Sequence, residues 1–215
     1  EMNKTFKLEN SELEVVIGKF AGQADGAAWM QNGNNRVLSV ATATKDTRDF
    51  LGFFPLTVEY REKTSAAGRI PGGYLKREGR LSDTEVLTSR LIDRSIRPFF
   101  PAEYFSEVQA ISSVYSADGT FPTNVMALVG ASIALGISSI PFKGPIGAVT
   151  VGRIDGQWRF NLSNEEDAKS DVHMLVAGTR DGICMVEGNC LLLSEDDMVD
   201  LLFVAHDQIL KQVAW

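Results

Sequence analysis

The sequence has no long hydrophobic run, only two cysteines, and no internal repeat or low-complexity segment within its 215 residues. No apolar stretch approaches the ~18 residues that a bilayer-spanning helix needs, which predicts a protein without a membrane span. Cys184 and Cys190 are too few for a disulfide framework, and no His or Cys lies near them at zinc-ligand spacing. The first ten residues hold no apolar segment typical of a secretory signal. We therefore expect a globular protein of a reducing compartment.

The chain has the composition of a folded domain. Hydrophobic residues make up 44% of it and charged residues 23%, and 215 residues are enough to bury a substantial core. No Pro- or Ser-rich linker divides it, so we expect one domain over residues 1–215. The chain stops in or at the end of its last predicted helix, so we expect it to be a fragment of something longer.

Local patterns predict more strands than helices. An Asn-Gly pair at 32–33 and an Asp-Gly pair at 155–156 are typical of tight hairpin turns. Strands are predicted at 12–20, 27–31, 36–44, 54–61, 107–116, 147–162 (a hairpin), 172–178 and 183–188. Helices are predicted at 81–98, at 122–138 with Pro122 in the first turn, and at 194–215 with Ser194 as cap. Hairpins dominate, which predicts an α+β fold with a mixed or antiparallel sheet packed against helices.

One basic segment interrupts an acidic chain whose net charge is -7. Between Arg69 and Arg97 there are seven Lys or Arg against four Asp or Glu, so the rest of the chain carries -10. The acidic total argues against coating a nucleic acid broadly. The local excess of positive charge indicates a site for an anionic partner.

The basic segment opens with "GRIPGGYLKREGR", residues 68–80. Its glycines allow the backbone to approach a ligand closely. Tyr74 offers a ring on which a base can stack, and Leu75 offers apolar contact. The cationic side chains that could meet phosphates are Lys76, Arg77 and Arg80. Stacking combined with phosphate charge is typical of single-strand binding, whereas the glycine spacing matches neither a P-loop nor a dinucleotide fingerprint.

The predicted helix that follows carries an arginine stripe. Ser82 and Glu85 have the spacing of a capping box, and Pro98 is expected to end the helix. Helical periodicity places Arg90, Arg94 and Arg97 on one face. This stripe could be a solvated face paired with nearby acids, or it could recognise phosphate or carboxylate through the planar guanidinium fork. The adjacent loop favours the second interpretation.

At these residues the chain resembles the first RNase PH-like core unit of polynucleotide phosphorylases. The most specific block runs from "AAGRIPGG" to "IRPFFP". The matching segments are 49–80, 87–101, 127–152 and 176–188. The resemblance implies an RNase PH-like fold and a part in phosphorolytic 3′–5′ degradation of RNA, in which inorganic phosphate releases nucleoside diphosphates and the reverse reaction polymerises them.

The resemblance also implies an assembly. Two such units per chain form a homotrimeric ring around a channel for single-stranded RNA, narrowed by a loop that maps onto Tyr74, Leu75, Lys76 and Arg77. Leu75 stands where the family more commonly has a second aromatic, so stacking is expected to fall mainly on Tyr74. Arg80 belongs to the same RNA-binding segment. Arg90, Arg94 and Arg97 are expected to contact RNA or anions near the active site of the other unit.

The same resemblance places the chemistry outside this chain. In the family, the serine motif that binds phosphate and the catalytic aspartates lie in the second unit, together with the Mg²⁺ site. Residues 24–35 hold no matching serine, and near 170–178 only Asp171 is present rather than paired acids. We therefore expect no catalytic residue and no metal ligand here.

Two alternatives stay open. The chain could be a stand-alone RNase PH or exosome-like ring subunit, or a structural RNA-binding module without turnover. The family further implies mRNA degradation, a place in an RNA-degradation complex, and a cytoplasmic location, or an organellar one if a transit peptide has been removed.

Overall fold

The computed structural model describes residues 3–9, 11–45, 52–73 and 79–215. Within these ranges, six strands form a first sheet in the order β1-β2-β3-β4-β6-β5. The strands are β1 (Lys4–Lys7), β2 (Leu13–Ile17), β3 (Gly26–Asn32), β4 (Asn35–Ala43), β5 (Leu56–Glu62) and β6 (Val108–Ser116). Strands β5 and β6 are parallel, and the other neighbours are antiparallel. The sheet is therefore mixed, and β5 is its edge.

A second, antiparallel sheet has the order β10-β9-β7-β8. Its strands are β7 (Gly147–Ile154), β8 (Gln157–Phe160), β9 (Val172–Gly178) and β10 (Ile183–Cys190). Asp155 and Gly156 have positive φ angles of 50° and 73° in the β7–β8 turn. The Asp-Gly hairpin predicted from the sequence is thus confirmed, since this turn needs φ > 0 at both central residues.

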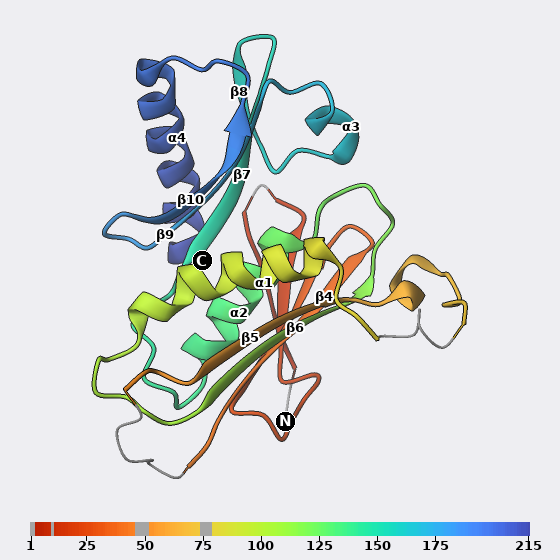
Figure 1. The fold of residues 1–215 in the computed structure, drawn as a ribbon, viewed down its shortest axis with the longest axis vertical. Helices are drawn as coiled ribbons and strands as arrows, with labels where there is room; N and C mark the ends of the chain where they lie inside the picture. Colours follow the sequence, from red (N-terminus) through yellow and green to blue (C-terminus); the bar gives the residue numbers. More distant parts are fainter. Residues whose placement is uncertain (1–2, 10, 46–51, 74–78) are drawn as a thin grey trace.

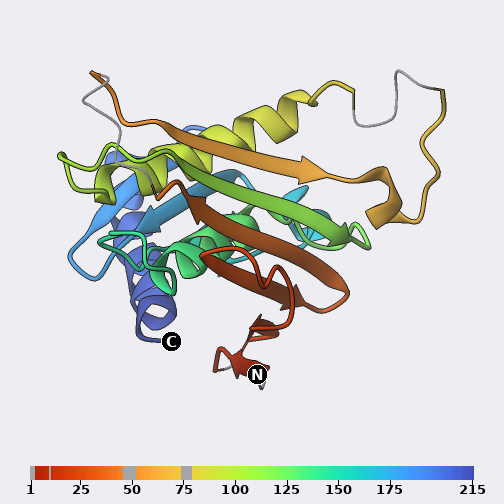
Figure 2. The ribbon, with the colours of Figure 1, turned by 90° about the horizontal axis from the view of Figure 1, so that it is seen from below.

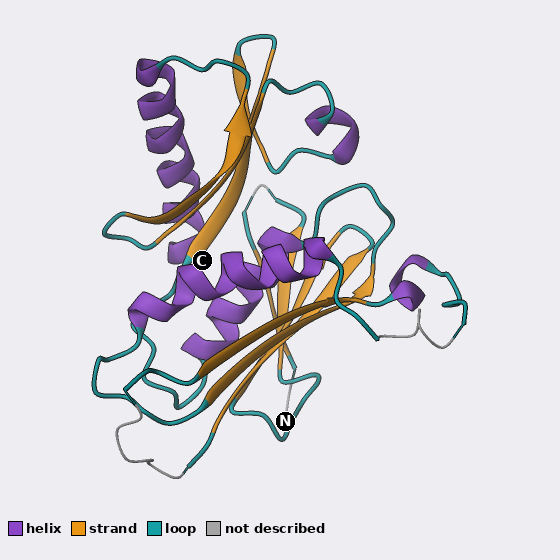
Figure 3. Ribbon diagram, in the orientation of Figure 1, coloured by secondary structure: helices purple, strands orange, loops and turns teal. Residues whose placement is uncertain are grey.

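Helices lie between and beside the two sheets (Figures 1 and 3). They are α1 (Asp83–Ile96), α2 (Asn124–Gly136), α3 (Asn164–Asp167) and α4 (Glu195–Ala214), with 3₁₀ turns η1 (Thr64–Ala67) and η3 (Arg97–Phe99). Helices α1 and α2 cover one face of the first sheet, and one apolar core joins them to Ile146, Ala148 and Met185 of the second sheet region. Helix α4 packs on the second sheet over a separate core. The α+β prediction is confirmed.

Helix α2 is buried almost all round, as its apolar composition predicted. At Gly130 a Cβ would lie 2.5 Å from Ser39 Oγ and 2.8 Å from Met30 Cγ, so only glycine lets the helix lie this close to β3 and β4. The expected place of Pro122 was wrong. Thr123 is the N-cap and the helix begins at Asn124. Pro122 therefore precedes the cap and lies outside the first turn.

Other predicted elements match with shifted ends. The predicted helix 81–98 is shorter, and the 3₁₀ turn η3 takes up Pro98. The helix predicted from 194 is confirmed, with Ser194 Oγ accepting from Asp197 N at 3.1 Å. The prediction omitted β1 and α3. All four residues of β1 are exposed, so no burial pattern marks it. None of the described helices is long and apolar enough to cross a bilayer.

Candidate nucleic-acid interface

Helix α1, which carries the arginine stripe, is fixed to the open edge of β5. Tyr60 N donates to Ser89 Oγ at 2.9 Å, and Glu62 N donates to Glu85 Oε1 at 2.9 Å. These N–H groups point away from β6 and would lack a partner at a bare sheet edge. The helix therefore completes the edge, and its arginines are presented from a rigid base.

The start of α1 forms the capping box that the sequence predicted. Glu85 Oε2 accepts from Ser82 N at 2.7 Å and from Ser82 Oγ at 2.9 Å, while Glu85 N donates to Ser82 Oγ at 3.2 Å. Burial alone would raise the pKa of the Glu85 carboxyl, but the hydrogen bonds from Ser82 and Glu62 together lower that pKa below its ordinary value. Glu85 is thus a buried carboxylate held ionised for structure.

Arg97 is bound within the fold. Its guanidinium donates to Asp93 one turn earlier, at 2.6 Å and 3.0 Å, and to the carbonyl oxygens of Phe54 and Leu56, each at 3.1 Å. The same guanidinium lies 5.9 Å from the centre of the Phe54 ring. Arg97 therefore ties the end of α1 to the start of β5, and these bonds use the donors that a phosphate would otherwise engage.

Arg94 forms an ion pair that joins α1 to the second sheet. Its Nη1 donates to Oε2 of Glu187 on β10, and the side chains of Arg94 and Glu187 are 52% and 42% exposed. Strand β10 is the edge of the second sheet. Nearby, Cys184 Sγ lies 4.0 Å from the Ser95 carbonyl oxygen, so α1 and β10 are neighbours at this point.

Arg90, one turn before Arg94, is exposed and has no hydrogen bond or ion pair to any residue that the structure describes. Val86 and Leu87 on the same side of α1 are 41% and 55% exposed. The accessible face of α1 thus combines apolar side chains with a guanidinium that no described residue engages and with a half-exposed ion pair. Such a face suits a ligand that has both a ring or sugar and a negative charge.

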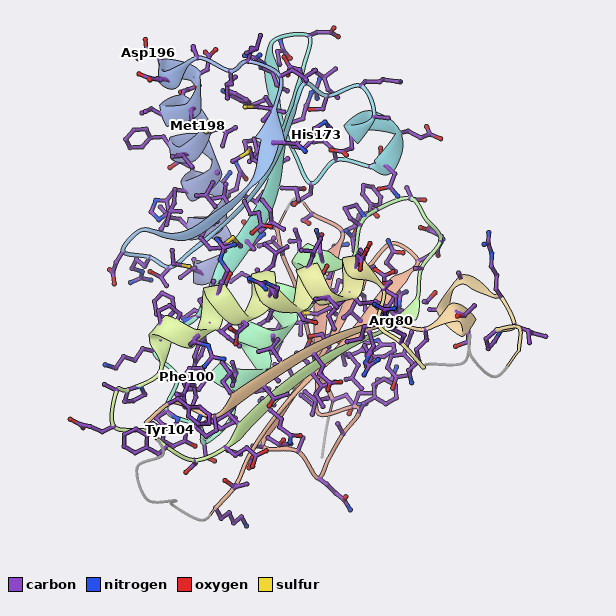
Figure 4. All side chains as sticks on the ribbon, viewed as in Figure 1. Arg80, Phe100, Tyr104, His173, Asp196 and Met198 are labelled. Carbon is purple, nitrogen blue, oxygen red and sulfur yellow. The ribbon has the colours of Figure 1, made fainter. Side chains whose placement is uncertain are left out.

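The segment 63–73, which follows β5, extends away from the two sheets (Figure 2). It leaves β5 through η1, which is fixed to the sheet where Ala117 N donates to Ala66 O at 3.0 Å, and Gly68 ends η1 with a φ of 68°. Arg80 is exposed and lies beside the start of α1, opposite the end near Phe100 (Figure 4). The other predicted RNA-binding residues lie outside the described residues: Tyr74, Leu75, Lys76 and Arg77.

The described residues do not fit a magnesium site. They contain no group of three or more His, Cys, Asp or Glu side chains that could hold a metal. Asp171 is bound by Arg153, whose Nη2 lies 2.6 Å from Asp171 Oδ2, and Arg153 also reaches Asp197 of α4 at 3.2 Å. The hydrogen bonds from Arg153 hold the pKa of the Asp171 carboxyl below its ordinary value. Through these two ion pairs Arg153 on β7 is joined to Asp171, directly before β9, and to α4.

Sequence reasoning missed Glu187. It is separated from Arg94 by 93 residues, and no spacing rule links a residue in a β-strand to one in a distant helix. The only available signal was an acidic residue in an otherwise apolar predicted strand.

Comparison with protein families defines the class. The sequence model described as "3' exoribonuclease family, domain 1" matches residues 9–141, and "3' exoribonuclease family, domain 2" matches residues 144–208. The chain belongs to the 3′ exoribonuclease family. Both α1 and the loop before it fall within the first match, whereas β10 and Glu187 fall within the second.

Within that family, curated relatives are polyribonucleotide nucleotidyltransferases. The chain is 47% identical over 209 residues to that of Oceanobacillus iheyensis, covering 97% of this chain and 30% of the relative. It is 50% identical over 202 residues to that of Halalkalibacterium halodurans, covering 94% of this chain and 29% of the relative. The chain therefore spans less than a third of the length of these relatives.

Solved structures share the fold at low identity. Rrp46 of rice (Oryza sativa) has a TM-score of 0.72 at 15% identity, over 95% of this chain and 93% of that one. A chain of the Archaeoglobus fulgidus exosome with RNA bound to the active site has a TM-score of 0.69 at 15% identity, over 93% and 85%. These likenesses establish the RNase PH-like fold.

Proposed function

We propose that this chain is the RNA-positioning unit of a phosphorolytic 3′–5′ exoribonuclease of the polyribonucleotide nucleotidyltransferase kind. In that reaction an oxygen of inorganic phosphate attacks the phosphorus of the last 3′ phosphodiester bond. The bond to the preceding 3′ oxygen breaks, and a nucleoside diphosphate leaves. The reverse reaction adds nucleotides from diphosphates and releases phosphate.

The observation that carries the proposal is the exposed face of α1, with Arg90 and Arg94, preceded in the sequence by a basic segment, in a chain that matches both family models. Arginine suits this role because its planar fork binds phosphate oxygens in pairs. It does not suit proton transfer, since its pKa lies far above neutral pH. The chain's own residues thus bind and orient RNA, with Tyr74 to Arg77 and Arg80 as the expected contacts upstream of Arg90 and Arg94.

The remaining parts of the proposal concern the complete enzyme. Catalytic acids, the phosphate-binding serine and Mg²⁺ belong to a second RNase PH-like unit, and three copies form a ring around single-stranded RNA. We place the enzyme in the cytoplasm, or in an organelle after removal of a transit peptide, within RNA degradation.

A turnover assay tests this division of labour. The purified 215-residue chain is incubated with a 3′-single-stranded RNA, inorganic phosphate and Mg²⁺, beside the full-length Oceanobacillus iheyensis enzyme as positive control. We expect RNA binding without release of nucleoside diphosphates from the 215-residue chain, whose folding is checked by circular dichroism. Release of diphosphates by this chain would show a stand-alone enzyme, and absence of RNA binding by a folded chain would leave only a structural role.

A further inference from the structure

The Arg94–Glu187 ion pair occupies the anion-binding face of the arginine stripe. Among the three arginines on α1, Arg97 is held by backbone carbonyls and Asp93, and Arg90 has no described partner. Arg94 is intermediate between a bound and an unengaged arginine, because its one described partner is the Glu187 carboxylate on β10 of the second sheet. Within the described part of the chain, the Glu187 carboxylate accepts a hydrogen bond from Arg94 alone.

The pair is accessible and weak enough to exchange. Both side chains are about half exposed, and exposed ion pairs stabilise a protein by less than ~1 kcal/mol. A phosphate group offers the guanidinium more acceptor oxygens in a matching geometry than a carboxylate held through one oxygen. An arriving phosphate can therefore replace Glu187 without disturbing the packing of α1 on β5.

We propose that Glu187 is a resident counter-ion that occupies Arg94 until a phosphate group displaces it, and so sets the affinity of this site for phosphate. The proposal rests on the proposed function, in which Arg94 meets a phosphate of RNA or the inorganic phosphate substrate. The carboxylate keeps Arg94 extended toward the gap between α1 and β10. The carboxylate also competes with incoming anions for Arg94, and anions that bind Arg94 only weakly do not displace it.

Three variants of the complete enzyme test the exchange. Glu187→Gln removes the competing charge and nearly preserves side-chain shape. Glu14→Gln is the control, because it removes a carboxylate from a second, partly exposed ion pair, that of Glu14 on β2 with Lys7 at 3.7 Å, where Glu14 also accepts from Gln31. Arg94→Ala removes the anion site itself.

Two measurements separate the two sources of phosphate. Binding of a fluorescent single-stranded oligoribonucleotide is followed against salt without inorganic phosphate or Mg²⁺, so that no turnover occurs. Phosphorolysis at saturating RNA then gives KM for inorganic phosphate separately from kcat.

We expect Glu187→Gln to strengthen phosphate binding by up to about fivefold, the range of an exposed ion pair. Tighter RNA binding, with a dependence of log affinity on log salt concentration that is steeper by up to ~0.7, identifies a phosphodiester of RNA at Arg94. A lower KM for inorganic phosphate at unchanged kcat identifies free phosphate at Arg94. Either result supports the proposal, provided that Glu14→Gln has neither effect.

Three results overturn it. If Glu187→Gln behaves like Glu14→Gln while Arg94→Ala weakens binding, Arg94 binds phosphate but Glu187 does not compete. If Glu187→Gln weakens binding in parallel with Arg94→Ala, Glu187 only orients the arginine. If Arg94→Ala also leaves both RNA binding and KM for inorganic phosphate unchanged, then this inference and the proposed role of Arg94 in binding are both wrong.

Discussion

Arg90 and Arg94 of α1 and Arg97, the C-cap of that helix, have different surroundings. Arg97 is bonded to two backbone carbonyls of the β5 region, Arg94 to a carboxylate of β10, and Arg90 to no described residue. An arginine whose donors are already used by the fold contributes to stability, and one whose donors are free is available to a ligand. The three residues are therefore expected to respond differently to substitution.

Arg97→Ala should lower the free energy of unfolding by about 1–3 kcal/mol, because it leaves carbonyl oxygens of Phe54 and Leu56 without their charged donor. Arg90→Ala should change stability by less than ~0.5 kcal/mol, as expected of an exposed residue, yet weaken RNA binding. Urea denaturation and an RNA titration of both variants provide the check. A stable Arg97→Ala protein with weakened RNA binding would assign Arg97 to the ligand instead.

The prediction of the stripe from sequence succeeded at the level of the helix face. Periodicity placed the three arginines together, and Arg90 and Arg94 lie in α1, whereas Arg97 is its C-cap and the first residue of η3. It could not separate Arg97 from the others, because the two backbone carbonyls that Arg97 binds, besides Asp93, lie about forty residues earlier in the chain. Such partners depend on how β5 and α1 come together.

At the scale of the element, α1 depends on Glu85, which joins its own cap to the edge strand. A carboxylate accepts from both Ser82 and Glu62. In Glu85→Gln the amide oxygen can still accept a hydrogen bond from one of these two backbone N–H groups. The NH₂ group then faces the other N–H, which is also a donor, so that hydrogen bond is lost. We expect a loss of about 1–3 kcal/mol in the free energy of unfolding at neutral pH.

The pH dependence has a definite sign. The pKa of Glu85 is lowered by folding, so its contribution is complete above the unfolded-state pKa of about 4.3 and is lost as pH falls through the folded-state pKa. The stability gap between the unsubstituted protein and Glu85→Gln should therefore narrow on acidification. Urea denaturation of both proteins at neutral pH and below about pH 4 measures the difference in their free energy of unfolding at each pH.

Glu166→Gln is the matched control for this prediction. Glu166 forms the same local capping box with Ser163 at the start of α3, but its side chain is exposed and its bonds go to Ser163 alone. We expect a much smaller loss from it than from Glu85→Gln. Equal losses would show that the cap, and not the bond to β5, explains the role of Glu85.

At the scale of the whole molecule, charge is distributed unevenly over an acidic body. The basic residues concentrate in the segment from Arg69 to Arg97, which includes the accessible face of α1. Nucleic acid should therefore approach this region and be repelled elsewhere. Long RNA is expected to be bound by the loop and α1 together.

Lys76→Ala with Arg77→Ala should weaken long-RNA binding in the complete enzyme and flatten its salt dependence by ~0.7 for each phosphate that is no longer neutralised. The control is Lys4→Ala with Lys169→Ala, which removes the same charge from exposed positions outside the basic segment. Binding against salt concentration is measured for both. An unchanged slope in the loop variant, or an equal change in the control, contradicts the assignment of the loop.

The sequence by itself determined the elements whose signals are local. Asp155-Gly156, the Ser82–Glu85 capping box, the apolar α2 and the amphipathic α4 were all predictable, because turn geometry, capping and periodicity act over a few neighbouring residues. The concentration of basic charge was equally visible. The resemblance in the "AAGRIPGG" to "IRPFFP" block pointed to the family that the comparisons then established.

Only the tertiary structure decided how those elements are used. Strand β1 exists through its pairing with β2, since its exposed residues carry no pattern of their own. Contacts between residues far apart in the chain hold Arg97 against the β5 region and pair Arg94 with Glu187. A side chain's availability to a ligand depends on which partners the packing brings within hydrogen-bonding distance, and that distance is set by the arrangement of the sheets around α1 and α2.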